Sequence, residues 1–493
     1  MELIIAILYV LLFSVLIWKL KIFEIKCIKK TWVLAVFFAK IAAGLALTLI
    51  YTYYYSDGEL SGDTAHYFND GKILNQVFSE SPKDYFTLLF SEGDQQLVET
   101  QLQNTEHWTR AEMDQFNDNR FIIRINSILS FFSLNSFYVH MLFFIMASMI
   151  GLTLFFKGIE DWIPKYQKEV FLLLFLFPSL LFWTSSVLKE SLLIFGFGLL
   201  FYGFRFYSSR PVWKLAMILI GLFVLLNTKV YFLLCILPAL AFYFLVQKSW
   251  KKNGVLFISM LILGVFFIWT NSYMESMNVT KYISQKQKDF NLVGKGGVYF
   301  MDNEHFYRID FKNKEALHIA HNYVRLKQDL QVEVKDFGSQ VYSRDSVLGK
   351  DMEFQFYSMQ EPSQSYFKVK EIDNNWVHLV VYSPIYIANV FFMPFPWQSG
   401  SFLKWLNILE NLFLFLLILF TLRYRKTGVL IDQKLFFFSL IFILLFYWII
   451  GATTPVVGAI VRYKTPAFLI WILLFLSIID FKRITLKPNK HKK

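Results

Sequence analysis

The sequence predicts an all-α polytopic membrane protein that also carries one small mixed or β-rich extracytoplasmic insertion. Of the 493 residues, 56% are hydrophobic and 17% are charged, whereas a soluble globular chain carries about 25% charged residues. The apolar residues gather in runs of about 17–25, the length that a helix needs to cross a bilayer. The two cysteines, Cys27 and Cys235, lie in unrelated segments. Neither a disulfide framework nor a Cys/His zinc site is therefore expected.

About 11 segments are apolar enough to be predicted as transmembrane helices, and short polar loops join most of them. The predicted helices are 2–18, 32–54, 137–156, 169–187, 190–206, 212–226, 230–246, 254–270, 403–422, 435–451 and 465–480. The stretch 379–395 is also apolar, but Pro384 lies within it and Pro394 and Pro396 close it. We expect an interfacial or re-entrant segment there, with its backbone satisfied by protein or headgroups.

The distribution of charge predicts the orientation in the membrane. Lysine and arginine are concentrated in short loops and in the C-terminal tail, whereas the long segment 56–136 has 13 acidic and 5 basic residues. The basic loops are 19–31, 204–214, 247–253 and 423–434. Because basic loops stay cytoplasmic, we expect an extracytoplasmic N-terminus and a cytoplasmic C-terminus. The net charge of +12 therefore indicates membrane lipids as partners and no nucleic acid.

Three regions are predicted along the chain. Residues 1–270 form an N-terminal transmembrane region that includes the extracytoplasmic loop 56–136. Residues 271–378 form the extracytoplasmic insertion, where short alternating stretches favour strands. Residues 379–493 contain the re-entrant segment, the C-terminal transmembrane helices and the basic tail. Within the first loop, helical spacing predicts a helix over Arg120–Ser133, which either lies in the interface with its arginines towards phosphates or packs on neighbouring helices.

The polar stretch Gly62–Gly71, predicted as a loop at the outer surface, is the main candidate for chemistry. Asp63 and His66 lie three residues apart in it, between glycines and aromatic residues. An Asp held against a hydroxyl can act as a general base, and exclusion of water can tune its pKa. We therefore predict Asp63 and His66 as catalytic residues, with solvated loop acids as the alternative. Supporting roles are predicted for three neighbours, Asp57, Glu59 and Tyr67.

No metal site or other cofactor is predicted. A divalent cation held by Asp57, Asp63 and His66 is a further option, but this spacing matches no established ligand pattern. Lys40 is a separate case, because it lies inside the second apolar segment. We expect its side chain to snorkel back to the cytoplasmic surface.

Polar residues also interrupt the apolar runs at two places before residue 230. Lys189 and Glu190 lie between two predicted helices, and Lys229 lies in another hinge. Charges at membrane depth are costly, so they default to a functional hypothesis, and we predict that both lysines bind a lipid phosphate. The alternatives are ordinary turns and, for Lys189 and Glu190, a self-paired surface ion pair.

Two further features lie near the C-terminus. Arg462 and Lys464 precede the last predicted helix, where they are expected to project from the outer surface. A guanidinium binds phosphate oxygens bidentately and an ammonium adds a point charge, so we predict lipid-phosphate binding or headgroup anchoring. Tyr463 between them and Trp397, an expected interface anchor, are predicted to support the site.

An acidic first outer loop, an interfacial helix after it, and Arg462–Tyr463 before the last helix resemble the GT-C superfamily of integral-membrane glycosyltransferases. The stretch PSLLFWTSSVLKES at 178–191 is similar to sequences of bacterial envelope-polysaccharide membrane proteins. The resemblance covers the transmembrane helices and the first loop. In the family the catalytic loop usually follows the first helix, whereas here it follows the second.

The resemblance implies an enzyme of the bacterial inner membrane that takes a sugar from a polyprenyl-phosphate-linked donor. The acceptor would be a glycan or lipid, in the assembly of cell-envelope polysaccharide. Asp63 would deprotonate the acceptor hydroxyl, and Arg462 and Lys464 would stabilise the leaving lipid phosphate. Three alternatives remain: a polymerase of polysaccharide repeat units, a transporter or flippase, and a non-catalytic envelope scaffold that uses residues 271–378.

Overall fold

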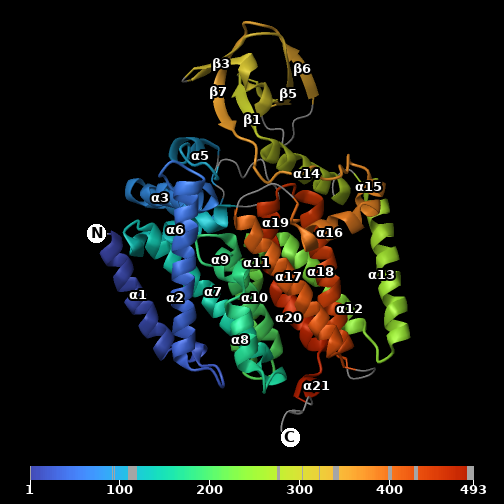
Figure 1. Ribbon diagram of the computed structural model, residues 1–493. Coiled ribbons are helices and arrows are strands. Elements are labelled where there is room, and N and C mark those ends of the chain that lie inside the picture. Colours follow the sequence, from blue (N-terminus) through green and yellow to red (C-terminus); the bar gives the residue numbers. More distant parts are fainter. Residues whose placement is uncertain are drawn as a thin grey trace. The chain divides into compact units, whose positions relative to one another are not determined.

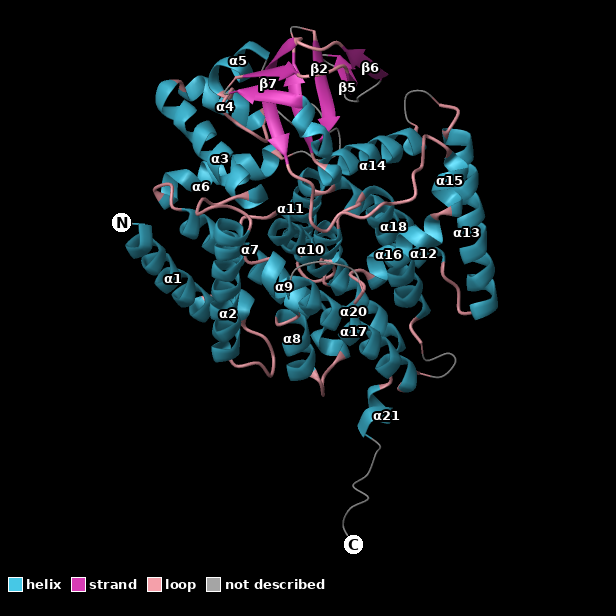
Figure 2. Cartoon of the chain, turned by 45° about the horizontal axis from the view of Figure 1, so that its top comes forward, coloured by secondary structure: helices cyan, strands magenta, loops and turns pink. Residues whose placement is uncertain are grey.

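The computed structural model describes residues 2–91, 93, 95–108, 119–274, 278–302, 304–320, 322–336, 344–397, 402–426 and 431–485. It divides into two compact units, Met1–Leu234 and Cys235–Lys493, and each is described by itself. Helices occur in both units (Figure 1), and the described strands belong to one sheet in the second unit (Figure 2).

The described part of the chain contains seven helices long and apolar enough to cross a membrane, so this is a helical membrane protein. The bent pair α19 (Val457–Lys464) and α20 (Ala467–Ile478), which meet at 54°, makes an eighth span if it crosses as one segment. The seven are Glu2–Lys19, Lys30–Tyr54, Phe137–Trp162, Pro211–Thr228, Trp250–Asn271, Lys404–Arg423 and Gln433–Thr453.

The first unit is largely helical where it is described. Its helices are α1 (Glu2–Lys19), α2 (Lys30–Leu49), α3 (Gly62–Glu80), α4 (Pro82–Phe90), α5 (Gln95–Gln101), α6 (Arg120–Ser133), α7 (Phe137–Ile159), α8 (Gln167–Phe175), α9 (Pro178–Trp183), α10 (Lys189–Arg205) and α11 (Pro211–Thr228). The helix α12 (Val230–Leu245) begins in this unit and ends in the next.

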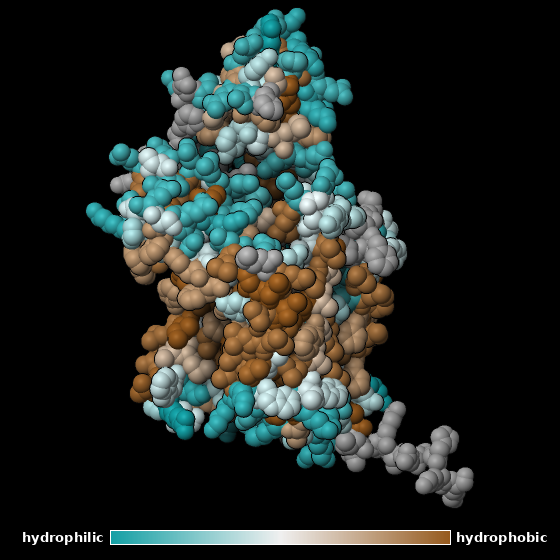
Figure 3. Space-filling view, turned by 90° about the vertical axis from the view of Figure 1, so that its left-hand side faces the viewer, coloured by the Kyte–Doolittle hydropathy of each residue, from teal (hydrophilic) through white to brown (hydrophobic). Residues whose placement is uncertain are grey.

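Close helix packing in the first unit depends on small residues, as expected in a membrane. The helices α7 and α10 touch where a Cβ on Gly198 would lie 2.1 Å from the carbonyl oxygen of Gly151. The outward side chains of α1, such as Leu3 and Ile4, are instead 70% and 65% exposed. On the face shown in Figure 3, apolar residues form a band with hydrophilic residues on both sides, as contact with lipid requires.

The described part of the segment 56–136 contains the helices α3, α4, α5 and α6, and the prediction of a loop over Gly62–Gly71 is wrong. This stretch is the start of α3. The predicted helix over Arg120–Ser133 is confirmed as α6, which packs on α3. Their approach is close, because a Cβ on Gly71 would lie 2.5 Å from the Cβ of Asn126.

The helix α6 buries polar residues as well as Ile122 and Ile123, and exposes apolar side chains of its last turns. Asn126, Ser127 and Ser130 are buried, whereas Phe132 is 61% exposed. Arg124 donates hydrogen bonds to the carbonyl oxygens of Leu88 (3.1 Å) and Ser91 (2.6 Å). Of the two alternatives for the arginines, packing on neighbouring segments therefore describes Arg124.

Residues 169–187 were predicted as one helix, and this is wrong. The helix α8 ends at Phe175, and Pro178 opens the short α9, because proline lacks an N–H and is favoured in a first helical turn. Residues 184–188 then form a turn and bends before α10 begins at Lys189. The chain is thus broken twice within a stretch that hydropathy alone treats as continuous.

The second unit combines helices with a seven-stranded antiparallel sheet in the order β3-β4-β7-β1-β2-β5-β6. The helices are α13 (Trp250–Asn271), α14 (Val279–Lys295), α15 (Trp376–Val381), α16 (Ser383–Phe392), α17 (Phe402–Arg423), α18 (Gln433–Thr453), α19 (Val457–Lys464), α20 (Ala467–Ile478) and α21 (Phe481–Thr485). The strands are β1 (Gly297–Met301), β2 (His305–Asp310), β3 (Leu317–Ala320), β4 (Tyr323–Leu326), β5 (Leu330–Asp336), β6 (Arg344–Leu348) and β7 (Glu353–Gln360).

The sheet lies within 271–378, where the sequence predicts a mixed or β-rich subdomain. One face of it forms a core that includes Val298, Phe300 and Val332. The apolar stretch 379–395 mostly falls in α15 and α16, and α16, with ten residues, is too short to cross a bilayer by itself. It packs on α18, where a Cβ on Gly451 would lie 2.0 Å from the carbonyl oxygen of Tyr386.

Candidate active site

The first turn of α3 places Asp63 by backbone geometry. Gly62 has a φ of +69°, a conformation that favours glycine, and a Cβ there would lie 2.7 Å from the ring of Tyr51. The hydroxyl of Ser61 donates to the carbonyl oxygen of Tyr51 at 2.6 Å, which ties the start of α3 to the end of α2. An acidic residue in a first helical turn is stabilised by the helix dipole. Asp63 is therefore held in position while its side chain stays 34% exposed.

One face of α3 carries the polar groups, because Asp63, His66, Tyr67 and Asp70 occur at positions i, i+3, i+4 and i+7. The buried carboxylate of Asp70 accepts hydrogen bonds from the backbone N–H groups of Glu106 (3.0 Å), His107 (2.7 Å) and Trp108 (3.2 Å). These bonds fix the chain at 106–108 against the helix. Burial raises the pKa of Asp70, and the three N–H groups act in the opposite direction by stabilising the carboxylate.

Two histidines lie at the centre of this cluster. The rings of His66 and His107 are stacked with centroids 4.6 Å apart. Nδ1 of His66 lies 2.7 Å from a carboxylate oxygen of Glu106, and Nε2 of His107 lies 3.7 Å from one of Asp63. Burial, and after it the neighbouring His107, lowers the pKa of His66, so its neutral imidazole is favoured at pH 7. The cluster thus contains two carboxylate–imidazole pairs side by side.

Buried charges accompany the cluster in the same unit. Glu190 is fully buried and Lys229 is 5% exposed, and their charged groups lie 2.8 Å apart. The alternative of a surface ion pair at Lys189 and Glu190 is wrong in its location, because both residues are buried, and Lys229, at the hinge between α11 and α12, pairs with Glu190. The ammonium of Lys189, 2% exposed, lies 6.0 Å from the ring centre of Tyr67 on α3. The start of α10 thus adjoins the polar face of α3.

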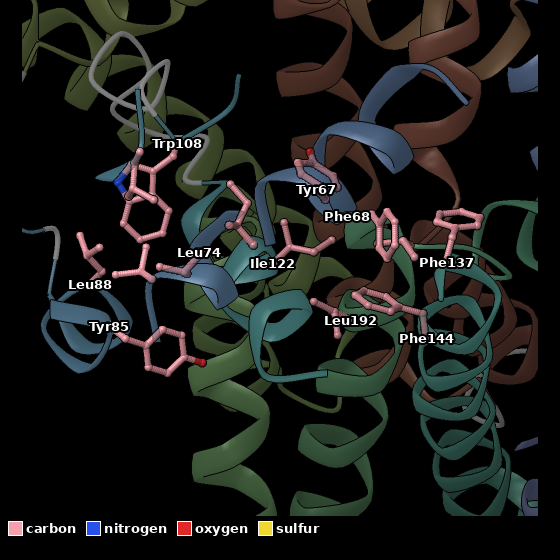
Figure 4. Packing of buried hydrophobic residues seen from close by; sticks show 14 of the residues in the cluster. Tyr67, Phe68, Leu74, Tyr85, Leu88, Trp108, Ile122, Phe137, Phe144 and Leu192 are labelled. Carbon is pink, nitrogen blue, oxygen red and sulfur yellow. The ribbon is translucent and has the colours of Figure 1, made fainter. Parts of the chain in front are cut away.

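A hydrophobic core beneath the polar face keeps these elements together. Figure 4 shows Phe68 and Leu74 of α3 among Ile122 of α6, Phe137 and Phe144 of α7 and Leu192 of α10. Trp108, which follows the hydrogen-bonded segment, is buried there as well. The guanidinium groups of Arg120 and Arg124 lie 5.7 and 5.2 Å from its ring centre, within cation–π range.

Of the three residues predicted to support this site, Tyr67 packs against the cluster, its ring centroid 5.5 Å from that of His107, whereas Asp57 and Glu59 lie outside it. Asp57 and Glu59 are exposed and precede α3. Tyr67 is buried, and its hydroxyl donates to the side-chain oxygen of Asn119 at 3.1 Å, which is a supporting contact. Within the described ranges no three His, Cys, Asp or Glu side chains are grouped as a metal ion requires.

The predicted cations of the second unit are buried, so the expectation that they project from the surface is wrong. Arg462 and Lys464 are each 8% exposed. The ammonium of Lys464 donates to the carbonyl oxygens of Val390 (3.2 Å) and Met393 (3.4 Å) and to the side-chain oxygen of Asn411 (2.8 Å). Lys464 therefore donates to carbonyl groups at the end of α16, because the last carbonyl groups of a helix have no partner within the helix itself.

The two aromatic residues predicted beside these cations have different surroundings. Tyr463 packs edge-on against Phe290 at a centroid distance of 6.3 Å. Trp397 is 79% exposed and stacks on Phe395 with centroids 4.8 Å apart. A large exposed indole fits the expected interface anchor.

Sequence reasoning missed Glu106 and His107, which complete the two carboxylate–imidazole pairs. The i, i+3, i+4, i+7 spacing from Asp63 to Asp70 was the available signal for a helical face. Nothing in the local sequence indicates that residues 106–108 return to that face. No family model, curated protein or solved structure matches the chain.

Proposed function

We propose that this protein is a membrane glycosyltransferase that moves a sugar from a polyprenyl-phosphate-linked donor to a hydroxyl of a glycan or lipid acceptor. The observation that carries the proposal is the placement of Asp63. Its partly exposed carboxylate is fixed by the first turn of α3 and faces an imidazole at 3.7 Å. A base held in this way can take the proton of a bound hydroxyl.

In the proposed reaction the acceptor hydroxyl loses its proton to Asp63. The acceptor oxygen then attacks the anomeric carbon, the bond from that carbon to the phosphate oxygen breaks, and the polyprenyl phosphate leaves with the electron pair. His107 receives or shares the proton from Asp63, and the His66–Glu106 pair supports it. Glu106 is 58% exposed, so this pair offers a route for the proton to water.

Lys189 and Lys229 are the proposed sources of positive charge for the leaving phosphate. Both are buried next to Glu190 at the start of α10, and Lys189 adjoins Tyr67 on the helix that carries Asp63. An ammonium in a site of low dielectric stabilises developing negative charge more strongly than one in water. The proposal thus places base and cations in the first unit, and assigns Lys464 to the packing of the second.

The proposed topology has an extracytoplasmic N-terminus and a cytoplasmic C-terminus in the bacterial inner membrane. It follows from the concentration of Lys and Arg in the loops 19–31, 204–214, 247–253 and 423–434. It includes about 11 crossings, among them the shorter apolar helices α10 and α12 and the broken segment α8–α9. Cysteine labelling with an impermeant maleimide at Asp57→Cys and at Lys251→Cys tests it, because only the first should react from outside.

The test of the activity uses the full chain in lipid nanodiscs, a set of polyprenyl-phosphate-linked radiolabelled hexoses as donors, and lipid-linked glycan from a host strain that lacks the gene. We expect transfer by the wild type and a loss of about 10²–10⁴-fold in Asp63→Asn. Asp57→Asn is the matched control, since that exposed carboxylate lies outside the cluster. Full activity of a folded Asp63→Asn variant would refute the assignment of the base.

The products of the same assay distinguish a polymerase of repeat units from a transferase of single sugars. A transferase adds one sugar and gives a single step on a gel, whereas a polymerase gives a ladder from the same lipid-linked glycan. A transporter or a scaffold would give neither product. The break before α10 favours the transporter as the second candidate, because transporters bind substrates at interrupted helices.

A further inference from the structure

Lys40 lies in the middle of the candidate span Lys30–Tyr54 and is fully buried. The prediction that it snorkels to the cytoplasmic surface is therefore wrong. Its ammonium points instead to the break between α9 and α10. A lysine in the interior of a membrane span is costly, so its partners there indicate a specific role.

The partners of Lys40 are neutral oxygens of two consecutive residues. Nζ lies 3.1 Å from the carbonyl oxygen of Thr184, 2.5 Å from its hydroxyl and 3.4 Å from the hydroxyl of Ser185. Both residues are fully buried. In these contacts the charge of the ammonium is therefore stabilised by dipoles and not by a carboxylate.

The two hydroxyls are oriented as acceptors. The Thr184 hydroxyl donates its own proton to the carbonyl oxygen of Leu180, and the Ser185 hydroxyl donates to that of Leu181. Their lone pairs are thus left for the ammonium. The carbonyl of Thr184 is further fixed by a hydrogen bond from the hydroxyl of Ser148 on α7, at 2.8 Å. Oxygens arranged in this way at an unwound helix are the ligands of a monovalent cation.

A close contact between α2 and the break positions the Lys40 ammonium. One turn after Lys40, a Cβ on Gly44 would lie 2.2 Å from the carbonyl oxygen of Ser185. Only glycine allows the backbone of α2 to come this close to the break. The close approach of Gly44 and the hydrogen bonds of the Lys40 ammonium therefore involve the same short segment, Thr184–Ser185.

We propose that the break between α9 and α10 is a monovalent-cation site that the chain fills with its own Lys40 ammonium. The bound ammonium fixes the residues 184–188 that lead into α10, and so the position of Lys189 and Glu190. The proposal does not depend on glycosyl transfer, and it would hold equally for a transporter.

Lys40→Ala should open the site for a free cation. The substitution removes three carbons and the nitrogen, which are the heavy atoms of propylammonium. In detergent solution we expect the variant to melt about 5 °C or more below the wild type. Propylammonium chloride at millimolar concentration should recover at least half of this difference, whereas tetramethylammonium, which has no N–H, should not.

Two controls show whether the rescue is specific. The wild type and Lys26→Ala, which changes a lysine whose side chain is 68% exposed, should not respond to propylammonium. A folded Lys40→Ala variant that propylammonium does not stabilise more than tetramethylammonium does would overturn the proposal.

If Lys40→Ala does not fold, a double-mutant cycle replaces the rescue experiment. Lys40→Met keeps an unbranched side chain only one atom shorter and without the charge, and Thr184→Val removes one ligand, the hydroxyl. The two substitutions should be strongly non-additive in Tm, because either one breaks the same contact. Additive effects would exclude the site.

Discussion

Lys229 in the first unit and Lys464 in the second are both buried, at 5% and 8% exposure, yet they have different partners. Lys229 lies 2.8 Å from the carboxylate of the fully buried Glu190. Lys464 donates to two carbonyl oxygens at the end of α16 and to Asn411. Helix ends need such donors wherever they are buried. Burial of a cation in a membrane protein is thus no evidence of function until its partners are known.

The surroundings of the two lysines differ as well. Glu190 and Lys189 begin α10 and adjoin the face of α3 that bears Asp63, His66 and Asp70. Around Lys464 the neighbouring polar group Asn411 also donates to the carbonyl oxygens of Phe392 (3.2 Å) and Met393 (2.9 Å). The first lysine thus pairs with a carboxylate beside the polar face of α3, whereas the second donates to oxygens at the end of α16 and feels the charge of the buried Glu410.

Breaking the ion pair of the first unit should have the largest effect on stability. Glu190→Gln leaves Lys229 as a buried charge without its carboxylate, which costs about 3–5 kcal/mol of unfolding free energy. Unfolding in a denaturing detergent measures this loss. The double variant Glu190→Gln, Lys229→Met should regain most of it, because the charge of Lys229 is removed together with that of Glu190. A double variant as unstable as the single one would show that the pair does not act as a unit.

Lys464→Met should have a smaller effect, since the hydrogen bonds that it removes go to neutral oxygens, although it also takes a positive charge away from the buried Glu410. We expect a loss of about 1–3 kcal/mol of unfolding free energy. Any activity per folded molecule should stay within about twofold of the wild type, in contrast to substitution of Asp63. Loss of activity with unchanged stability would instead mean that Lys464 acts in a substrate site, as Lys229 is proposed to do, and not only in packing.

The sequence was most informative where periodicity is strong and local. Hydropathy identified the long spans, and the helical spacing of Arg120–Ser133 gave the bounds of α6. It failed at α3, because Gly62 and Gly71 suggest a loop, whereas in the fold Gly62 opens the helix and Gly71 admits Asn126.

The partners of the buried charges could not be predicted, because they come from distant parts of the chain. Lys40 meets Thr184, and Glu190 meets Lys229, through tertiary packing that leaves no local pattern. Lys464 was placed at the surface because a short loop precedes the last helix. The carbonyl groups of α16 that need it lie more than 70 residues earlier.

The smallest expected effect concerns pH and the His66–His107 stack. The folded pKa of His66 is lowered below its ordinary value of 6.5, by burial first and by His107 second. Above pH 6.5 the residue is neutral in both the folded and the unfolded chain and contributes no pH dependence. As pH falls below 6.5, the unfolded chain binds the proton first, so stability falls through this window until the folded ring is protonated too. His66→Asn should therefore flatten the fall of Tm between about pH 6.5 and 5. An identical slope in the wild type and His66→Asn would mean that the stack does not oppose protonation, and would remove His66 from the titrating part of the proposed site.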